Sequence, residues 1–253
     1  MMRFIEVLFS PAEFAALERR DLSHTTCVVF DVLRATSSMT TALANGAKAI
    51  LPVADIAEAL SVKRRQPEVL LAGERNSVRI LRDQTGSLDF DLGNSPREFT
   101  PERVRGRIIV MTTTNGTLGL RAGAAAQATF VGCFLNLGAV AKEICRRPPE
   151  RLILVCSGTF EEAALEDTLA AGALGDAVWP LYSDGQVADS AQMARVLFRQ
   201  LGSDLLAAMS LARNGRRLLS QPELRDDVPF CLRRDVFNLV AALGPDGAVR
   251  QLL

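Results

Sequence analysis

Short apolar runs that alternate with polar loops and amphipathic stretches are the feature that most restricts the fold of this chain. Seven runs are rich in Val, Ile and Leu without strict polar–apolar alternation, as expected for strands covered on both faces. They span residues 4–9, 26–30, 49–53, 69–72, 108–111, 129–132 and 152–156. Strands that alternate with helical stretches predict an α/β protein with a mostly parallel or mixed sheet.

Helix signals fill the stretches between and after these runs. Ser10, Pro11 and Glu13 have the spacing of a helix start, with a capping residue, a proline and an acid that can bond back to the cap. From Glu161 onward the pattern is mostly helical. Because no Gly/Ser linker and no change of composition divides the chain, we expect a single domain over residues 1–253 with a helical C-terminal third.

The composition excludes several kinds of protein. The chain has 29 Lys and Arg and 29 Asp and Glu, so its zero net charge cannot drive binding to a nucleic acid, although a local anion site is permitted. No apolar run reaches the length of about 18 residues that a membrane span needs. The first residues make a poor signal peptide. We therefore expect a cytoplasmic protein with neither membrane nor nucleic acid as a partner.

Cysteine and histidine are too scattered for the common metal and redox sites. The five cysteines are odd in number and widely spaced, without a Cys-x-x-Cys pair, which indicates reduced and mostly buried thiols. Cys156, at the end of a strand, is interpreted as one of these structural thiols. His24 is the only histidine, which excludes a site with several histidine ligands and disfavours a Ser-His-Asp triad.

Polar residues follow four of the predicted strands, at the ends where open α/β sheets bind their ligands. Arg34 and Arg75 can each donate two parallel hydrogen bonds to a phosphate, sulfonate or carboxylate. Asp31 and Glu74 are hard oxygen ligands suited to Mg²⁺. Hydroxyl and backbone N–H groups near two predicted helix starts can hold an anion; the residues concerned are Thr36, Ser37, Thr113, Asn115, Gly116 and Thr117.

Each of these residues also has a purely structural explanation. A Ser/Thr cluster before a helix is more often only a cap, and an acid at a strand end is as often a cap or an ion-pair partner. A single arginine is usually a solvated surface group. Four strand ends with compatible chemistry nevertheless favour an anion site.

Two further segments carry acidic residues. The turn-forming run Gly93-Asn94-Ser95-Pro96 is either a simple turn or a loop that brings Asp91 and Asn94 to the site. Asp167 lies on a predicted helix whose acidic residues form either a solvated face or a part of the site.

The common phosphate-binding and hydrolase motifs are absent. The chain contains no phosphate-binding loop, no Gly-x-Gly-x-x-Gly and no Gly-x-Ser-x-Gly. Asp31 follows a strand, as the nucleophile of haloacid-dehalogenase phosphatases does, but Leu33 stands where those enzymes have a second aspartate. Cys27 is not followed by an arginine at the spacing of cysteine phosphatases.

Taken together, several segments resemble the 2-phosphosulfolactate phosphatase family. They occur in the family's order and are spread over roughly the span from residue 28 to 172; they are Asp31-Val32-Leu33-Arg34-Ala35-Thr36-Ser37, Ala42-Leu43-Ala44-Asn45-Gly46-Ala47, Ala72-Gly73-Glu74-Arg75, Phe90-Asp91-Leu92-Gly93-Asn94-Ser95-Pro96, Thr112-Thr113-Thr114-Asn115-Gly116-Thr117 and Leu165-Glu166-Asp167. The C-terminal third matches mainly in Asn214-Gly215-Arg216-Arg217-Leu218 and Asp227-Val228-Pro229-Phe230-Cys231. Where the family usually has Gly-Gly, this chain has Asn76-Ser77.

The resemblance implies a three-layer α/β/α fold and an enzyme that hydrolyses phosphate monoesters. Its implied reaction is the Mg²⁺-dependent hydrolysis of 2-phospho-3-sulfolactate to sulfolactate and inorganic phosphate, a step toward coenzyme M in archaea. Two alternatives stay open: a phosphatase of another phosphorylated hydroxy acid, such as phospholactate, and a non-catalytic anion-binding protein on the same scaffold. Apolar faces on the C-terminal helices either form a homodimer or belong to the core.

The predicted site follows from both lines of reasoning. Asp31, Arg34 and Asp91 are expected to be catalytic, and Asp31, Glu74, Asp91 and Asp167 are the candidate Mg²⁺ ligands. The sequence leaves open whether Asp31 is a metal ligand, a general base or a nucleophile. The expected substrate-binding residues are Thr36, Ser37, Arg75, Asn94, Ser95, Thr113, Asn115, Gly116 and Thr117.

Overall fold

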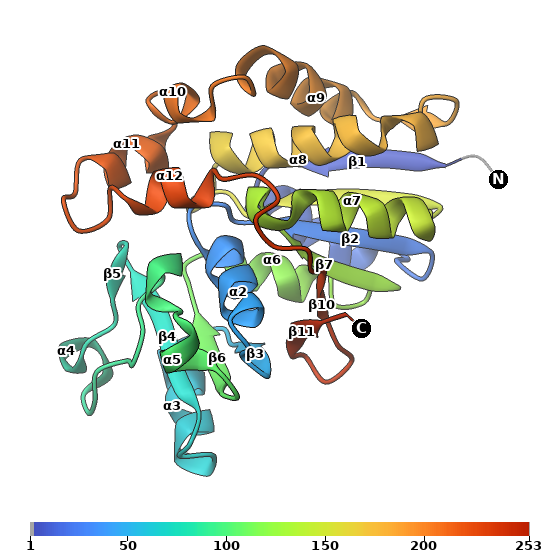
Figure 1. The fold of residues 1–253 in the computed structure, drawn as a ribbon. Coiled ribbons are helices and arrows are strands. Elements are labelled where there is room, and N and C mark those ends of the chain that lie inside the picture. The colour runs from blue at the N-terminus through green and yellow to red at the C-terminus, as the bar shows by residue number, and fades with distance from the viewer. Residues whose placement is uncertain (1–2, 253) are drawn as a thin grey trace.

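The computed structural model describes residues 3–252 and shows one mixed sheet with helices on both faces (Figure 1). The eleven strands are β1 (Phe4–Leu8), β2 (Thr25–Phe30), β3 (Ala49–Pro52), β4 (Leu70–Arg75), β5 (Val78–Arg79), β6 (Ile108–Thr112), β7 (Ala128–Gly132), β8 (Arg151–Cys156), β9 (Gln186–Val187), β10 (Ala241–Leu243) and β11 (Val249–Gln251). They lie in the order β5-β4-β6-β3-β11-β10-β7-β2-β8-β1-β9. The predicted three-layer α/β/α fold is therefore confirmed.

Helices connect the strands and continue beyond them. They are α1 (Pro11–Ala15), α2 (Ala35–Ala44), α3 (Ile56–Arg65), α4 (Arg82–Thr85), α5 (Pro101–Val104), α6 (Gly116–Ala122), α7 (Leu137–Arg146), α8 (Leu165–Val178), α9 (Asp189–Leu201), α10 (Leu205–Met209), α11 (Arg213–Leu219) and α12 (Asp227–Cys231). Helix α1 starts as predicted, because the backbone N–H of Ser10 donates to the Glu13 carboxylate at 2.9 Å. The C-terminal third is mostly helical, as the sequence predicted.

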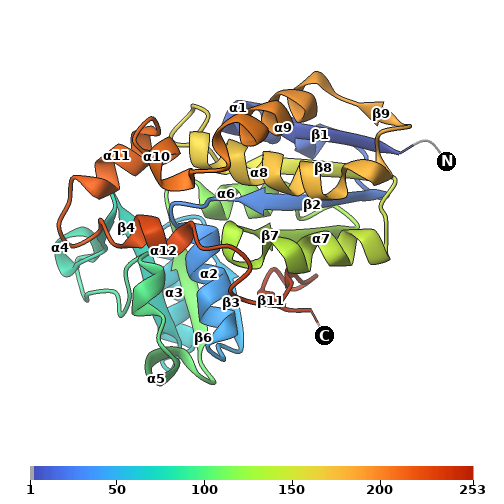
Figure 2. The same cartoon turned by 45° about the horizontal axis from the view of Figure 1, so that its top comes forward.

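The sheet has two parallel halves. Strands β4, β6 and β3 form one half, and β7, β2, β8, β1 and β9 form the other. The hairpin β10–β11 lies between them, antiparallel to β7 on one side and to β3 on the other. The strands of the two halves run at an angle to each other. The carboxyl ends of β2 and β4 therefore come together beneath α11 and α12 (Figure 2).

The seven predicted strands all appear, with bounds that differ by one to three residues. The sequence did not predict β10 and β11, because each has only three residues and such a short run has no readable periodicity. Their pairing nevertheless joins the two halves of the sheet.

Successive residues of β2 explain why the central strands read as continuous apolar runs. Val28 and Phe30 pack into a cluster beneath α7 and α8, whereas Cys27 and Val29 pack into a second cluster beneath α2 and α6. All four side chains are fully buried. Because both faces of the strand are covered, neither set of alternating positions has to be polar.

Helix α8 is buried along nearly its whole length, between α7 and α9. A methyl group on Gly172 would lie 2.1 Å from the backbone oxygen of Ala194 in α9. The small residues of α8 therefore allow the two helices to approach closely.

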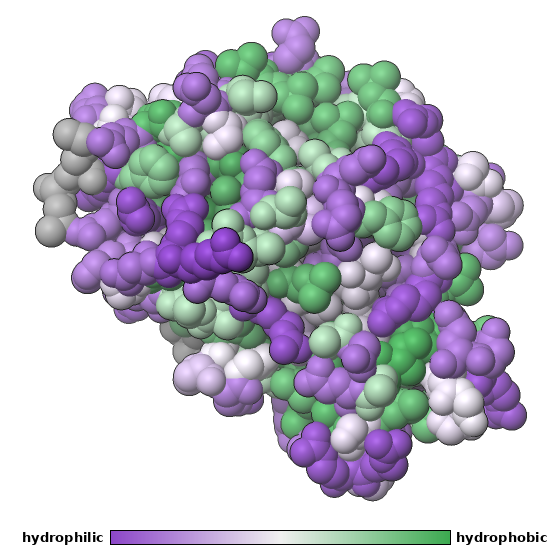
Figure 3. Space-filling model, turned by 180° about the vertical axis from the view of Figure 1, so that it is seen from behind, coloured by the Kyte–Doolittle hydropathy of each residue, from purple (hydrophilic) through white to green (hydrophobic). Residues whose placement is uncertain are grey.

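Figure 3 shows the distribution of polar and apolar residues on one face of the molecule. On the rear face, hydrophilic residues predominate and hydrophobic residues lie in small groups between them (Figure 3). Within residues 3–252, the helices are all too short or too polar to cross a bilayer. The five cysteines are free, and Cys156 is fully buried, as expected for a structural thiol.

Candidate functional site

A polar cleft lies at the carboxyl ends of β2, β4, β6 and β8. Five of the predicted site residues line it, namely Asp31, Arg34, Glu74, Asn94 and Asn115. Gly158 and Thr159, which follow β8, also contribute to the wall. The four strand ends selected by the sequence therefore do converge on one cleft.

Asp31 is positioned by the start of α2. Its Oδ1 accepts a hydrogen bond from the backbone N–H of Ala35 at 3.1 Å, and its own N–H donates to Thr36 Oγ1 at 3.1 Å. The carboxylate thus caps the helix from the preceding loop. The N–H of Thr36, which the sequence offered to an external anion, instead donates to the backbone oxygen of Asp31 at 2.9 Å.

Burial raises the pKa of Asp31 to about 7. The negative charges of Glu74 and Glu166 contribute to this rise, while the Ala35 N–H and the charge of Arg34 oppose it. A carboxyl group of this kind is partly protonated near neutral pH.

Glu74 lies opposite, at the end of β4, and is almost fully buried. Its Oε2 accepts from the Ser77 N–H at 2.7 Å, and its Oε1 accepts from the N–H of Thr114 at 3.1 Å and from the hydroxyl of Thr114 at 2.9 Å. Three hydrogen bonds hold this carboxylate in place, and the two from Thr114 link the end of β4 to the loop after β6.

Asn115 and Gly116 connect β6 to the rest of the cleft. The Asn115 amide donates to the backbone oxygens of Ser157 and Phe160, at 3.1 and 2.9 Å. A methyl group on Gly116 would lie 2.6 Å from Asp31 Oδ2 and equally close to the Ala35 Cβ. Glycine is therefore required at position 116 because the backbone passes directly against Asp31.

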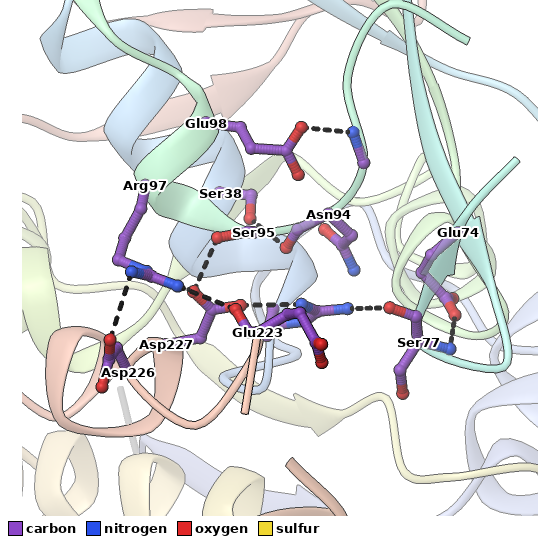
Figure 4. Close-up of polar contacts among 12 residues, drawn as sticks. Ser38, Glu74, Ser77, Asn94, Ser95, Arg97, Glu98, Glu223, Asp226 and Asp227 are labelled. Atoms are coloured by element: carbon purple, nitrogen blue, oxygen red, sulfur yellow. Dashed lines mark hydrogen bonds and ion pairs between the residues drawn. The ribbon is translucent and has the colours of Figure 1, made fainter. Parts of the chain in front are cut away.

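Arg34 is buried in the cleft wall and is held at both nitrogen tips. Its Nη1 donates to Asp227 Oδ2 at 2.7 Å, and its Nη2 donates to the backbone oxygen of Ser77 at 2.7 Å. Asp227 also accepts from Ser95 and Arg97, which meet it from the other side (Figure 4). The guanidinium group is thus fixed in one orientation.

Helix α11 forms the roof of the cleft. The Asn214 amide donates to Thr159 Oγ1 at 2.5 Å and to Glu166 Oε1 at 2.6 Å. One turn further, Arg217 donates from Nη2 to the backbone oxygen of Asn76 at 2.7 Å. Both side chains line the cleft, so the C-terminal third supplies an amide and a second cation to the site.

Two acids of α8 lie behind the cleft. Asp167 accepts from the backbone N–H groups of Val32 at 2.8 Å and Gly158 at 3.1 Å, so it joins the loops after β2 and β8. Burial, followed by the charges of Glu166 and Asp31, raises the pKa of Asp167 well above its usual range. Glu166 is also buried, and its Oε2 has no hydrogen-bond partner within the described part of the chain.

The structure places Asp91 and Arg75 outside the cleft. Asp91 is exposed, and its Oδ2 accepts from the N–H of Leu71, three residues before Glu74 on β4. Arg75 donates to the backbone oxygen of Glu74 and to Thr112 Oγ1. Neither side chain is among the residues that line the cleft.

The hydroxyl-bearing residues of the predicted set surround the cleft without lining it. Ser37 donates to the backbone oxygen of Val32, and Ser95 donates to Asp227. Thr113 and Thr117 are buried, and their hydroxyl oxygens have no partner among residues 3–252. Ser37 and Ser95 therefore bind other parts of the protein through their hydroxyl groups.

The donor set of the cleft suits a magnesium ion. Across residues 3–252, no three Asp, Glu, His or Cys side chains are grouped as metal ligands. Mg²⁺, however, is commonly held by one or two carboxylates with water and phosphate oxygens, and Asp31 and Glu74 both line the cleft. Their mutual repulsion, which raises the pKa of Asp31, would be relieved by a divalent cation.

Sequence reasoning missed Asn214, Arg217 and Asp227 as site residues. They lie at least 40 residues beyond the strand-end loops on which the search concentrated. Their segments were noticed only through the family resemblance, because no local pattern indicates which exposed face of a short helix covers a cleft.

The fold and the site define the class of the protein: a three-layer α/β protein with a strand-end cleft suited to a small anion. Two carboxylates, of Asp31 and Glu74, and two guanidinium groups, of Arg34 and Arg217, meet in this cleft.

Sequence comparison identifies the family. The model of the 2-phosphosulpholactate phosphatase family matches residues 13–245. A protein named probable 2-phosphosulfolactate phosphatase from Caldanaerobacter subterraneus subsp. tengcongensis is 38% identical over 239 residues, covering 94% of this chain and 95% of the relative. One of the same name from Pseudothermotoga lettingae is 35% identical over 247 residues, covering 98% and 99%. The chain belongs to the 2-phosphosulfolactate phosphatase family, a family of phosphate-monoester hydrolases.

Proposed function

We propose that this protein hydrolyses 2-phospho-3-sulfolactate to sulfolactate and inorganic phosphate. The observation that carries the proposal is the meeting of Asp31 and Glu74 with Arg34 and Arg217 in one cleft. The relatives, which match nearly the whole chain, are named for this substrate. An acid pair for a cation and an arginine pair for anions are the parts that phosphoryl transfer requires.

The arginines account for recognition of the anionic substrate. The substrate carries phosphate, sulfonate and carboxylate groups, whereas the protein has a formal net charge of zero, so positive charge has to be concentrated locally. Arg34 donates one N–H of Nη1 to Asp227 and one N–H of Nη2 to the backbone oxygen of Ser77. Its other N–H groups remain for a ligand.

Asp31 and Glu74 would hold Mg²⁺. When bound, the ion would polarise the phosphoryl oxygens and offset the negative charge that develops during transfer. The chain's own residues then bind and orient the substrate: Arg34 and Arg217 contact its charged oxygens. In phosphoryl transfer such positioning and charge stabilisation supply most of the rate enhancement.

Protonation of Asp31 would make cation binding depend on pH. Because the pKa of Asp31 is raised to about 7, part of the protein carries a protonated Asp31 near neutrality. Asp31 would hold a cation as the ionised carboxylate, so it would have to give up this proton to do so. Glu74, held by three hydrogen-bond donors, keeps its position in both states.

A second candidate substrate is another phosphorylated hydroxy acid. Asn76 and Ser77 line the cleft and both have positive φ angles, 57° and 70°, where glycine is the usual residue. Their side chains occupy space that glycine would leave open. This difference favours a smaller substrate than the sulfonated one, such as phospholactate.

The test is phosphate release from 2-phospho-3-sulfolactate and from phospholactate, each with Mg²⁺ and with EDTA. Mg²⁺-dependent release that strongly favours the sulfonated compound supports the proposal. Equal kcat/KM for both compounds supports the second candidate. A folded protein that releases phosphate from neither would leave the non-catalytic anion-binding protein as the function of this scaffold.

A further inference from the structure

We infer that Asp227 is a positioning residue that aims Arg34 into the cleft, with Arg97 offsetting the charge of Asp227. The inference rests on the proposed anion-binding role of the cleft. Asp227 begins α12 and is fully buried, 193 residues away from Arg34 in the chain. It does not line the cleft, so it acts through Arg34.

Three side chains donate hydrogen bonds to the Asp227 carboxylate. Oδ2 accepts from Arg34 Nη1 at 2.7 Å, while Oδ1 accepts from Ser95 Oγ at 2.6 Å and from Arg97 Nε at 2.8 Å (Figure 4). An amide at this position would turn its NH₂ group toward one of the arginines. The site therefore requires an ionised carboxylate, with two oxygens that only accept.

Arg97 has an electrostatic role in this network. A single buried Arg34–Asp227 pair would be neutral, and Arg34 would attract an anion only weakly. Arg97 adds a second positive charge on the other side of the same carboxylate. Its outer edge donates to the backbone oxygen of Glu223 at 3.0 Å and lies 3.5 Å from the carboxylate of Asp226. Because Asp226 is exposed, water and salt screen its charge, so it offsets the charge of Arg97 only in part. With Asp227 shared between two guanidinium groups, Arg34 keeps more of its attraction for a phosphorylated ligand.

The same network fixes the direction of the guanidinium group. Asp227 holds Nη1 and the Ser77 backbone oxygen holds Nη2, so the plane of the Arg34 group is set from two sides. An unrestrained arginine would lose side-chain entropy on binding a ligand. Asp227 thus places Arg34 before the substrate arrives.

A double-mutant cycle with Arg34→Gln and Asp227→Asn tests the inference. The matched control is Asp176→Asn, because Asp176 also accepts from two arginines, Arg195 at 2.7 Å and Arg199 at 2.8 Å, but on α8 and α9 away from the cleft. The measurements are kcat and KM for phosphate release, the Kd of inorganic phosphate, and the melting temperature of each variant.

We expect Asp227→Asn to raise KM and the Kd of phosphate about 10- to 100-fold, the range usual for residues that orient a ligand-binding group, and to change kcat less. In the Arg34→Gln background the same substitution should change KM and Kd by less than about twofold, because the guanidinium group that Asp227 positions is absent. Asp176→Asn should leave KM and Kd unchanged. Arg97→Gln should weaken phosphate binding less than Asp227→Asn, because Arg97 is partly exposed.

Two results would overturn the inference. One is a double variant, still folded, whose loss equals the product of the two single losses, which means that Asp227 acts independently of Arg34. The other is an Asp227→Asn variant with wild-type KM and Kd. A wild-type protein without turnover would refute the proposed reaction alone, because the cycle is then read from the Kd of phosphate.

Discussion

Gly116 passes so close to Asp31 that a methyl group on the glycine would lie 2.6 Å from Oδ2 of the aspartate. Replacement of Gly116 by alanine should therefore displace the Asp31 carboxylate. We expect kcat to fall at least about 10-fold and the free energy of unfolding to fall by about 1–3 kcal/mol, as for other overpacked sites. Phosphate release and urea unfolding measure the two effects.

Gly119→Ala is the matched control on the same helix. A methyl group there would lie 2.9 Å from Ser157 Oγ and 3.0 Å from Val29 Cγ1, so stability should fall while Asp31 stays in place. Equal loss of kcat in both variants would contradict the role given to the Gly116–Asp31 contact.

Asp31 and Asp91 were both predicted from sequence to be catalytic, and the structure separates them. Asp31→Asn should lower kcat at least about 100-fold, the lower end of effects for groups that act directly on reaction charge or protons. Asp91→Asn should keep kcat within about twofold, because Asp91 lies outside the cleft and an amide oxygen can still accept from the Leu71 N–H. The check is phosphate release at saturating Mg²⁺, with melting temperatures to confirm folding. Normal turnover of a folded Asp31→Asn variant would remove Asp31 from the mechanism.

Arg217 and Arg216 are neighbours with different partners. Arg217 lines the cleft, whereas Arg216 is exposed and donates to the backbone oxygen of Leu211 at 2.6 Å. Arg217→Gln should raise KM about 10- to 100-fold, as expected when a hydrogen-bonded charge is lost. Arg216→Gln should leave KM within about twofold. A steady-state comparison of the two variants decides whether α11 supplies a substrate-binding cation.

The raised pKa of Asp31 predicts a pH-dependent stability. The folded state binds the proton more tightly than the unfolded chain, whose aspartate has a pKa of 3.8. This contribution to stability is complete below that value and is lost as the pH rises through about 7. In EDTA, the melting temperature of wild type relative to Asp31→Asn should therefore fall by at least about 4 °C between pH 5 and pH 8.

Added Mg²⁺ should raise the melting temperature of the wild-type protein again at pH 8, and it should have little effect on the melting temperature of Asp31→Asn. Ligand binding to the folded state raises its stability by mass action, and the ionised carboxylate is the form that binds a cation. Scanning calorimetry at the two pH values, with Mg²⁺ and with EDTA, makes the comparison. Parallel pH profiles for the two proteins would contradict the assignment of Asp31.

Much of the central sheet could be predicted because its determinants are local. A strand such as β2 has apolar residues at every position since both of its faces are covered, and this pattern is visible in a short window. The strands of the hairpin β10–β11 could not be predicted, because three residues each are too few to show a pattern. Their pairing with β7 and β3 is visible only in the structure.

The same distinction holds for the candidate site. Asp31, Arg34, Glu74, Asn94 and Asn115 were selected because each follows a strand or lies in a polar turn, and all five line the cleft. Asp91 satisfied the same rule, but its carboxylate is bonded to Leu71 on β4. A rule based on position along the chain cannot tell which way a loop side chain turns.

The sequence alone determined the fold class, the strand ends that form the cleft and the family, because periodicity and local motifs are written in consecutive residues. Tertiary structure decided which side chains meet. It brought Asn214 and Arg217 over the cleft and placed Asp227 against Arg34. These contacts depend on how the C-terminal helices pack over the two halves of the sheet. Packing between distant segments leaves no periodic pattern in the sequence.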